Sequence, residues 1–250
     1  EYHDWNVTVP LPDTTRPTVP SLLSPSNGAT TTDPTVSLDW SNSSDSSGID
    51  YYQVQVDNSS SFSSPEFNAT PSSSNDTTST LADGYYYWRV SARDNAGNWS
   101  FWSSYRTFRV DRTAPNVPSL SSPANNAHTT DTTPSFDWSD STDSGSGVEK
   151  YQLIVETDTL GINKIDVEVT SSNYNTPISE ALDAGGAGYD WRVRACDYAG
   201  NCSDWTSNRR LYVDDIADTT PPSIPSLVSP AHNAHTTDTT PSFDWSDSTD

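Results

Sequence analysis

Apolar and polar side chains alternate with a period of two in several short stretches of the chain. The clearest are TVSLDW (35–40), YYQVQVD (51–57) and YYYWRVSA (85–92), in which every second residue is apolar. Strict alternation between turn-forming residues is typical of antiparallel strands that bury one face. The pattern therefore predicts short, half-buried strands, and we identify no helix.

The same landmarks recur along the chain, and this periodicity defines a tandem repeat. In order, the landmarks are joints rich in Thr and Pro (13–17, 111–115 and 218–222), Asp-Trp pairs (39–40, 137–138 and 244–245) and the related segments WRVSARDNAGN (88–98) and WRVRACDYAGN (191–201). They predict the last strand of a preceding repeat in 1–13, complete repeats in 14–111 and 112–218, and the truncated start of a third repeat in 219–250. Because proline fixes its own φ and restricts the residue before it, the joints are expected to be stiff.

The number of predicted strands indicates the fold class. About seven short strands in about 100 residues, separated by turns, are typical of a β-sandwich. Each repeat is therefore predicted to be all-β, a seven-stranded antiparallel sandwich. Such sandwiches serve many functions, so the fold by itself does not assign one.

The repeats resemble the fibronectin type III family over both complete copies and both fragments. The residues that carry the resemblance are tryptophans of the second strand, tyrosines of the third, and leucine–tyrosine pairs near the sixth: Trp40, Trp138, Trp245, Tyr52, Tyr151, Leu81 with Tyr86, and Leu182 with Tyr189. The resemblance implies that Tyr86 and Tyr189 each bond back to nearby backbone, as in a tyrosine corner. The Asp-x-Ala-Gly-Asn turns and the joints resemble the repeat arrays of bacterial and archaeal surface proteins and secreted enzymes.

The segment WSFWS (99–103) resembles the Trp-Ser-x-Trp-Ser box that precedes the last strand in fibronectin-type domains of cytokine receptors. That resemblance implies a ladder in which Trp99 and Trp102 interleave with Arg89 and Arg93, each pair contributing about 0.5–2 kcal/mol. The second repeat carries CSDWT at this place, which favours a structural clasp over a receptor surface. An exposed platform for carbohydrate is the functional alternative.

Cys196 and Cys202 are the only cysteines, and they align with Arg93 and Trp99 of the first repeat. A disulfide is predicted to replace the cation–aromatic pair at this place, and it would imply an oxidising compartment. Two thiols without a nearby histidine give too few ligands for a zinc site.

The chain is strongly acidic, with 34 Asp and Glu against 12 Lys and Arg, and its formal net charge is -22. Such a charge repels phosphates, so neither nucleic acid nor an anionic membrane surface is an expected partner. No apolar run approaches the ~20 residues of a membrane span, so no membrane insertion is expected in this segment.

Some of the acidic residues are expected to gather at the joints. In a sandwich of this family, the incoming joint and the loops after the second and sixth strands share one pole. The carboxylates expected there are Asp13, Asp45 and Asp94 in the first repeat, Asp111, Asp140, Asp143 and Asp197 in the second, and Asp218, Asp247 and Asp250 in the third. Calcium takes about six to eight oxygen ligands and is the candidate cofactor here. The alternative is that these residues are solvated or bond their own turns.

Asparagine glycosylation is a candidate modification. Seven Asn-x-Ser/Thr sequons occur, at Asn6, Asn42, Asn58, Asn68, Asn75, Asn98 and Asn201. If they are used, they indicate a secreted surface. A chain this rich in Ser and Thr also produces sequons by chance.

The sequence shows no catalytic constellation, because its four histidines are not recognisably paired with a nucleophile and no glycine-rich phosphate loop occurs. The chain is not expected to be an enzyme. We expect a structural segment of a long extracellular or cell-surface repeat protein that self-associates into a rod, filament or adhesin stalk. The alternatives are spacer modules of a secreted polysaccharide-degrading enzyme, or a glycan-binding adhesin or receptor ectodomain.

Overall fold

The computed structural model describes residues 11–158, 161–217 and 219–249. These residues form β-strands joined by turns, with one short 3-10 helix, η1 (Ile178–Glu180). Within these ranges, no helix has the length and apolar character needed to cross a membrane. The strand expected at the end of a preceding repeat, with Asn6, lies in residues 1–10 and thus outside the described part of the chain.

Among the described residues, the first repeat contains eight strands in two sheets. Their bounds are β1 (Leu22–Ser24), β2 (Ala29–Thr31), β3 (Ser37–Trp40), β4 (Ile49–Asp57), β5 (Phe67–Ala69), β6 (Asn75–Thr77), β7 (Gly84–Asp94) and β8 (Arg106–Val110). One sheet has the order β1-β3-β6, and the other has the order β2-β8-β7-β4-β5. Neighbouring strands are antiparallel except for β2 and β8, which are parallel.

The second repeat reproduces this topology strand for strand. Its strands are β9 (Leu120–Ser122), β10 (Ala127–Thr129), β11 (Ser135–Trp138), β12 (Val148–Thr157), β13 (Asn163–Val169), β14 (Asn173–Asn175), β15 (Ala187–Asp197) and β16 (Arg209–Val213). The sheet orders are β9-β11-β14 and β10-β16-β15-β12-β13. The predicted equivalence of the two sequence copies is therefore also an equivalence of structure.

The first strand of the sandwich is divided in both repeats. In the first repeat, β1 pairs with β3 in the three-stranded sheet, whereas β2 pairs with β8 in the five-stranded sheet. Between them the chain crosses from one sheet to the other, at a turn where the Ser24–Pro25 peptide bond is cis and Gly28 has a φ of 79°. The predicted seven-stranded sandwich is present, with its first strand shared between both sheets.

The alternating stretches place one set of side chains between the two sheets, because successive residues of a strand point to opposite faces. In β7, Trp88 and Val90 are 0% exposed, while Tyr85 on the outer face is 45% exposed. The buried residues form two separate cores, one containing Trp88 in the first repeat and one containing Trp191 in the second. Burial of apolar surface is the dominant favourable term in folding, so each repeat is expected to fold on its own core.

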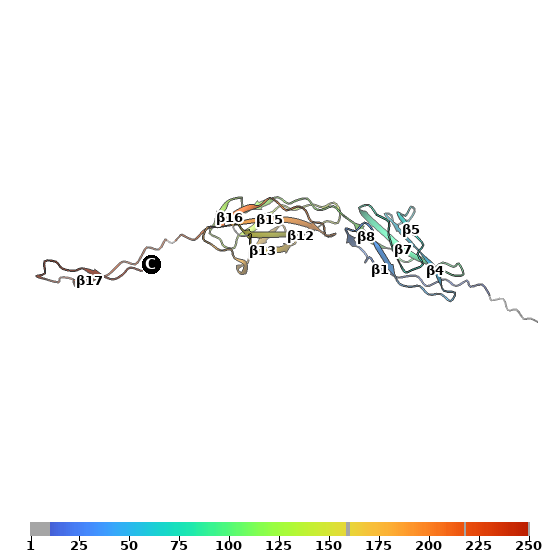
Figure 1. Cartoon of the computed structure of the whole chain (residues 1–250), viewed down its shortest axis with the longest axis horizontal. Coiled ribbons are helices and arrows are strands. Elements are labelled where there is room, and N and C mark those ends of the chain that lie inside the picture. Colours follow the sequence, from blue (N-terminus) through green and yellow to red (C-terminus); the bar gives the residue numbers. More distant parts are fainter. Residues whose placement is uncertain (1–10, 159–160, 218, 250) are drawn as a thin grey trace, which may run out of the picture.

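Figure 1 shows the two sandwiches following one another along the longest axis, with the hairpin of β17 (Leu227–Ser229) and β18 (Asp244–Trp245) beyond the second. In this segment Phe243 and Trp245 are 67% and 59% exposed. Trp138, which holds the equivalent position in the second repeat, is 2% exposed. The difference arises because no second sheet covers the hairpin among the described residues.

Candidate functional site

The joint between the two repeats is centred on Asp111, the residue that follows β8. Its backbone N–H donates to the carbonyl oxygen of Thr31 in the first repeat (2.9 Å), and its Oδ2 accepts from the N–H of Ser146 in the second (2.5 Å). Across the same joint, the Thr30 hydroxyl donates to the carbonyl oxygen of Tyr198, at 2.6 Å. Burial opposes ionisation of Asp111, but hydrogen bonds from Ser146 and Thr113, together with the charge of Arg109, outweigh this effect and lower the pKa of the carboxyl. The residue that joins the two sandwiches is therefore 1% exposed and carries a charged carboxylate.

Two further carboxylates form a cluster with this residue. Asp143, from the loop between β11 and β12, and Asp197, at the end of β15, each offer an oxygen within 4.8 Å of one on Asp111. Asp197 is 0% exposed, and its oxygens accept from the N–H and Nδ2 of Asn201, both at 2.8 Å. The same Nδ2 donates to the carbonyl oxygen of Asp111, at 3.0 Å. Gly145 borders the cluster, since a side chain there would overlap the Asp111 carboxylate.

One oxygen of this cluster has no protein donor. Oδ2 of Asp143 accepts from the N–H of Gly147 at 2.7 Å, whereas its Oδ1 is buried and has no hydrogen-bond partner among the described residues. A buried acceptor without a partner costs about 1–3 kcal/mol, and more when it is charged. A cation bound at this place would supply the missing partner.

The start of the first repeat carries the same arrangement. Asp13, Asp45 and Asp94 offer oxygens that lie within 4.8 Å of one another. Asn98 donates to both oxygens of Asp94, from its N–H at 2.7 Å and from Nδ2 at 2.8 Å, and the same Nδ2 reaches the carbonyl oxygen of Asp13 at 3.1 Å. Asp13 therefore has the place in the first repeat that Asp111 has in the second.

Hydrogen bonds keep carboxylates of the first cluster ionised. The hydroxyl and N–H of Thr15 lower the pKa of Asp13 to about 2. Burial opposes ionisation of Asp94, but the bonds from Asn98 and from the backbone N–H groups of Gly97 and Ala96 together outweigh it and lower the pKa of this carboxyl as well. Clustered carboxylates that remain charged repel one another. Their oxygens are the ligand type that a hard cation such as calcium prefers.

The structure does not gather all the acidic residues that the sequence assigned to the joints. Asp140 is exposed and lies outside the cluster of the second repeat, because the loop after β11 directs Asp143 to the joint instead. In the third segment Asp247 is exposed, and Asp218 and Asp250 lie outside the described residues.

A ladder of aromatic rings and arginines covers part of the outer face of the first repeat's five-stranded sheet. The Arg89 guanidinium lies over both Phe62 and Trp102, at 4.0 and 4.2 Å from the ring centroids. The alternation of apolar residues does not mark Phe62, because this residue lies in the serine-rich loop between β4 and β5 and not in an alternating stretch. The ladder therefore joins Arg89 of β7 to two rings that lie outside the strands, Phe62 in the loop between β4 and β5 and Trp102 in the segment between β7 and β8.

The other half of the expected ladder is arranged differently. Arg93 forms a β-bridge with Trp99, but its guanidinium lies over Tyr51, at 5.3 Å, and its Nη1 binds Asp50 at 2.7 Å. Tyr51 in turn meets Trp99 edge-on, with ring centroids 5.5 Å apart. Tyr51 enters because β4 is the neighbour of β7 in the sheet, so an outward ring of β4 lies beside Arg93.

Cys196 and Cys202 form a disulfide, with their Cα atoms 4.1 Å apart. The two cysteines make the same isolated β-bridge that Arg93 and Trp99 make in the first repeat. Trp205 keeps part of the ladder, since two arginines of β15 lie over its ring at 5.3 and 4.6 Å. The second repeat thus replaces one non-covalent contact by a covalent bond.

Reducing this disulfide is expected to lower the unfolding free energy of the second repeat by about 2 kcal/mol, a modest value because the closed loop is short. Denaturant unfolding followed with and without a phosphine reductant measures the change, and the double variant Cys196→Ala/Cys202→Ala should match the reduced protein. The transition of the first repeat, which contains neither cysteine, serves as the internal control. Equal stability of the reduced and oxidised second repeat would contradict this expectation.

The sequons fall into two structural classes. Asn98 and Asn201 use Nδ2, the atom that would carry a glycan, to bond the carboxylates of Asp94 and Asp197. The sequons with exposed residues in the described chain are Asn42, Asn58, Asn68 and Asn75. A glycan on Asn98 or Asn201 would therefore displace hydrogen bonds of the joints, whereas the exposed group belongs to the surface of the first repeat.

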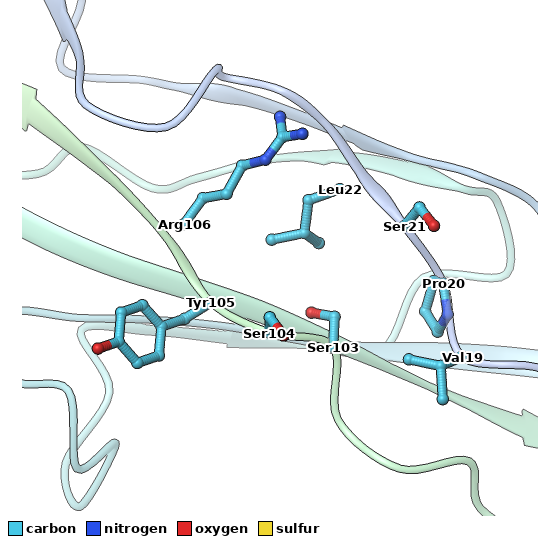
Figure 2. Close-up of a pocket in the computed structure, with 8 residues that line it drawn as sticks. All are labelled: Val19, Pro20, Ser21, Leu22, Ser103, Ser104, Tyr105 and Arg106. Atoms are coloured by element: carbon cyan, nitrogen blue, oxygen red, sulfur yellow. The ribbon is translucent and has the colours of Figure 1, made fainter.

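A groove of about 510 Å³ opens along the seam between the two sheets of the first repeat. Segments 19–22 and 103–106 line it, and Figure 2 shows Leu22 directed into the space between them. The Arg106 guanidinium at this groove donates to two backbone carbonyls of the neighbouring segment, at 2.8 and 3.3 Å. The second repeat has a groove of about the same volume at the same place. Both repeats contain this groove, and its arginine already donates to backbone carbonyls. We therefore interpret the groove as a general feature of the fold and not as a ligand site.

No family model matches this chain. No curated protein matches it either. Among solved structures, the fibronectin(III)-like modules of Clostridium thermocellum CbhA superpose with a TM-score of 0.51 at 13% identity, over 78% of this chain and 94% of theirs. The complete repeats have a fibronectin type III-like fold.

The fibronectin-like repeats also match other solved structures. These include the FN1-FN3 domains of chicken CNTN1, with a TM-score of 0.45 at 15% identity over 79% of this chain and 68% of that one. A segment of titin has a TM-score of 0.47 at 13% identity, over 78% of this chain and 66% of that one. Such identities report the fold alone.

Both fibronectin-like repeats contain the tyrosine contact that the sequence resemblance implies. The Tyr86 hydroxyl donates to the carbonyl oxygen of Ala82, at 2.9 Å. The Tyr189 hydroxyl oxygen accepts from the N–H of Asp183, also at 2.9 Å. Each bond links a strand, β7 or β15, to the segment that immediately precedes it in the chain.

Proposed function

We propose that this chain is a structural segment of an extracellular protein, in which fibronectin-like repeats stack end to end into a rod. The observation that carries the proposal is the buried Asp111, whose backbone bonds the first repeat and whose carboxylate bonds the second. Relative motion of neighbouring domains is the default when few contacts join them, and this residue opposes it. The Cys196–Cys202 disulfide supports an oxidising, extracellular location.

Calcium at the joints would complete this structural role. The residues that would hold it are Asp111, Asp143 and Asp197 at one joint, and Asp13, Asp45 and Asp94 at the other. The buried, unpaired Oδ1 of Asp143 supports the proposal, because a bound cation would give that oxygen a partner. When bound, the ion would neutralise the repulsion among the carboxylates and link the joint to two loops of the following repeat.

To form a filament, such rods would have to associate laterally. The edge strands β5 and β13 have no strand neighbour on one side among the described residues, and open edges allow pairing with another chain. Asp166 and Glu168 on β13, and a glycan on the exposed Asn68 of β5, would limit how closely two edges approach. We therefore propose association that is loose and dependent on salt.

A spacer in a secreted polysaccharide-degrading enzyme is the second candidate, because the same joint would hold two functional domains apart. Modules of this fold occur in CbhA of Clostridium thermocellum. A catalytic domain elsewhere in the full-length protein would favour the spacer, whereas further repeats on both sides would favour the rod.

Small-angle X-ray scattering of the chain tests the rod. The parent is expected to fit one elongated arrangement of the two complete repeats, and Asp111→Ala is expected to broaden the interdomain distances, because it removes the bond from Ser146. Asp204→Ala removes an exposed carboxylate away from the acidic cluster and is the matched control. A parent that samples many interdomain angles, or an Asp111 variant identical to the parent, would overturn the proposal.

A further inference from the structure

The outer face of the first repeat's five-stranded sheet carries three tyrosines in contact, which we call the tyrosine patch: Tyr85, Tyr87 and Tyr105. The ring of Tyr87 meets Tyr85 at 5.4 Å and Tyr105 at 5.2 Å, and it is nearly perpendicular to both, at 80° and 83°. Phe62 extends the row, with its centroid 6.5 Å from that of Tyr105. The rings therefore continue the arginine–aromatic ladder across the sheet toward solvent.

The tyrosine patch is accessible, unlike the tryptophans that the sequence placed in this region. Tyr85 and Tyr105 are 45% and 52% exposed. Figure 2 shows the Tyr105 ring directed away from Leu22 and the seam between the sheets. Trp102 is half-buried beneath Arg89, so its indole face is already occupied. A ligand of this face can therefore contact Tyr85 and Tyr105 directly.

The fold does not require these rings. The second repeat has the same strands and register, but Gly188, Asp190 and Asn208 stand at the equivalent positions. There an ion pair takes the place of the rings, since Arg210 binds both oxygens of Asp190 at 2.9 Å. Two repeats with one fold thus differ on this face: the first presents three adjoining tyrosines, whereas the second has a stacked pair of His128 and Tyr212 with ring centroids 4.7 Å apart.

Phe62, at one end of the row of rings, has an unfavourable backbone conformation. It has a φ of 51°, in the left-handed region that a bulky side chain disfavours. In the second repeat, the corresponding loop between β12 and β13 uses Gly161, with a φ of 59°, and glycine adopts this conformation freely. The contacts of the buried Phe62 ring with Arg89 and Tyr105 offset the cost of this backbone conformation.

The charges of the chain and of the residues around the tyrosine patch limit which ligands can bind there. The net charge of -22 disfavours polyanions. Cations are not favoured at the patch itself, because Arg89 lies in the ladder and Arg109 pairs in register with Tyr85. Asp57, which pairs in register with Tyr87, is 2% exposed and accepts from the N–H of Ser59. The tyrosine patch is therefore best suited to a neutral ligand that has both apolar and hydroxyl surfaces.

We propose that the tyrosine patch binds a neutral polysaccharide chain. The apolar C–H faces of sugar rings would pack on the exposed rings of Tyr85 and Tyr105, and the phenolic hydroxyls would bond sugar hydroxyls. Tyr105, Tyr87 and Tyr85 lie in a row that offers contact to consecutive sugars of one chain, which suits a polymer better than a single sugar. This function adds to the structural role and does not depend on the joints.

Affinity electrophoresis of the whole chain in gels containing cellulose derivatives, xylan, mannan or β-glucan, all uncharged, tests the proposal. At least one of these polysaccharides is expected to retard the parent. The double variant Tyr85→Ala/Tyr105→Ala is expected to weaken that binding at least about tenfold, which corresponds to about 1.4 kcal/mol. Thermal melts establish that the variant is folded, as expected for two side chains whose equivalents in the second repeat are not aromatic.

The matched control is Ile178→Ala, which removes an apolar side chain that is 89% exposed in the second repeat and is expected to leave binding unchanged. Retardation of the parent by none of the neutral polysaccharides would overturn the proposal. Retardation by anionic polysaccharides alone, or binding that the folded double variant retains, would also overturn it. Sedimentation provides a further arm, because a parent that self-associates and a variant that does not would assign the tyrosine patch to contact between copies of this chain instead.

Discussion

Replacing Trp191 by alanine is expected to unfold the second repeat under conditions in which the first repeat stays folded. Trp191 is 0% exposed, belongs to the second core and meets Phe136 edge-on with ring centroids 5.1 Å apart. Removing a buried tryptophan costs about 3–5 kcal/mol, a large fraction of the ~5–15 kcal/mol that stabilises a typical domain. The two cores share no residue, so the first repeat is expected to keep its stability.

Differential scanning calorimetry of the whole chain measures this effect. Trp191→Ala should lower one transition, and Trp88→Ala, the equivalent change in the first repeat, should lower the other. Ile178→Ala, at an exposed position of the second repeat, should lower neither. If either tryptophan variant lowered all transitions equally, the repeats would form one cooperative unit and the expectation of separate cores would be wrong.

Adding calcium is expected to raise the unfolding temperature of the parent, and Asp197→Asn is expected to remove this rise for the second repeat. Asp197 is 0% exposed and shares its cluster with Asp111 and Asp143, so an ion there would contact the joint and the second repeat together. Asparagine keeps the size of the side chain but removes the charge that attracts the ion. A ligand present at about 100 times its Kd stabilises the folded state by about 2.7 kcal/mol, which a thermal melt detects readily.

The readout is the difference between melts recorded after chelation and after addition of excess calcium. This difference separates loss of the ion from loss of the hydrogen bonds that Asp197 makes with Asn201 in the absence of calcium. Asp94→Asn should have the same effect on the first repeat, and Asp204→Asn, an exposed carboxylate outside both clusters, should have none. A parent that unfolds at the same temperature with and without calcium would contradict the calcium proposal for the joints.

The alternation of apolar residues predicted the strands and their buried faces, because it is a local property of the chain. Trp88 and Val90 are alternate apolar residues of the stretch 85–92, and both are 0% exposed. The outward position of Tyr85 follows from the same rule. The fibronectin-like fold could therefore be predicted from strand pattern, landmarks and repeat length.

Contacts that depend on neighbouring strands and loops could not be predicted in this way. The Arg93 guanidinium lies over Tyr51 because β4 lies beside β7, and alternation within either strand does not report which strands are neighbours. Phe62 reaches Arg89 because the loop between β4 and β5 folds over the sheet. Serine-rich loop sequence carries no periodic signal for such a contact.

By itself the sequence determined the repeat, the faces that each strand buries, and the supply of carboxylates near each joint. Only the tertiary structure decided that Asp143 and not Asp140 completes the cluster with Asp111 and Asp197, and that Tyr85 and Tyr105 adjoin Tyr87 on an exposed face. The physical reason is that periodicity along a strand reports which side faces solvent. It does not report which loop ends come within 4.8 Å of one another, because that depends on how strands distant in sequence pair and pack.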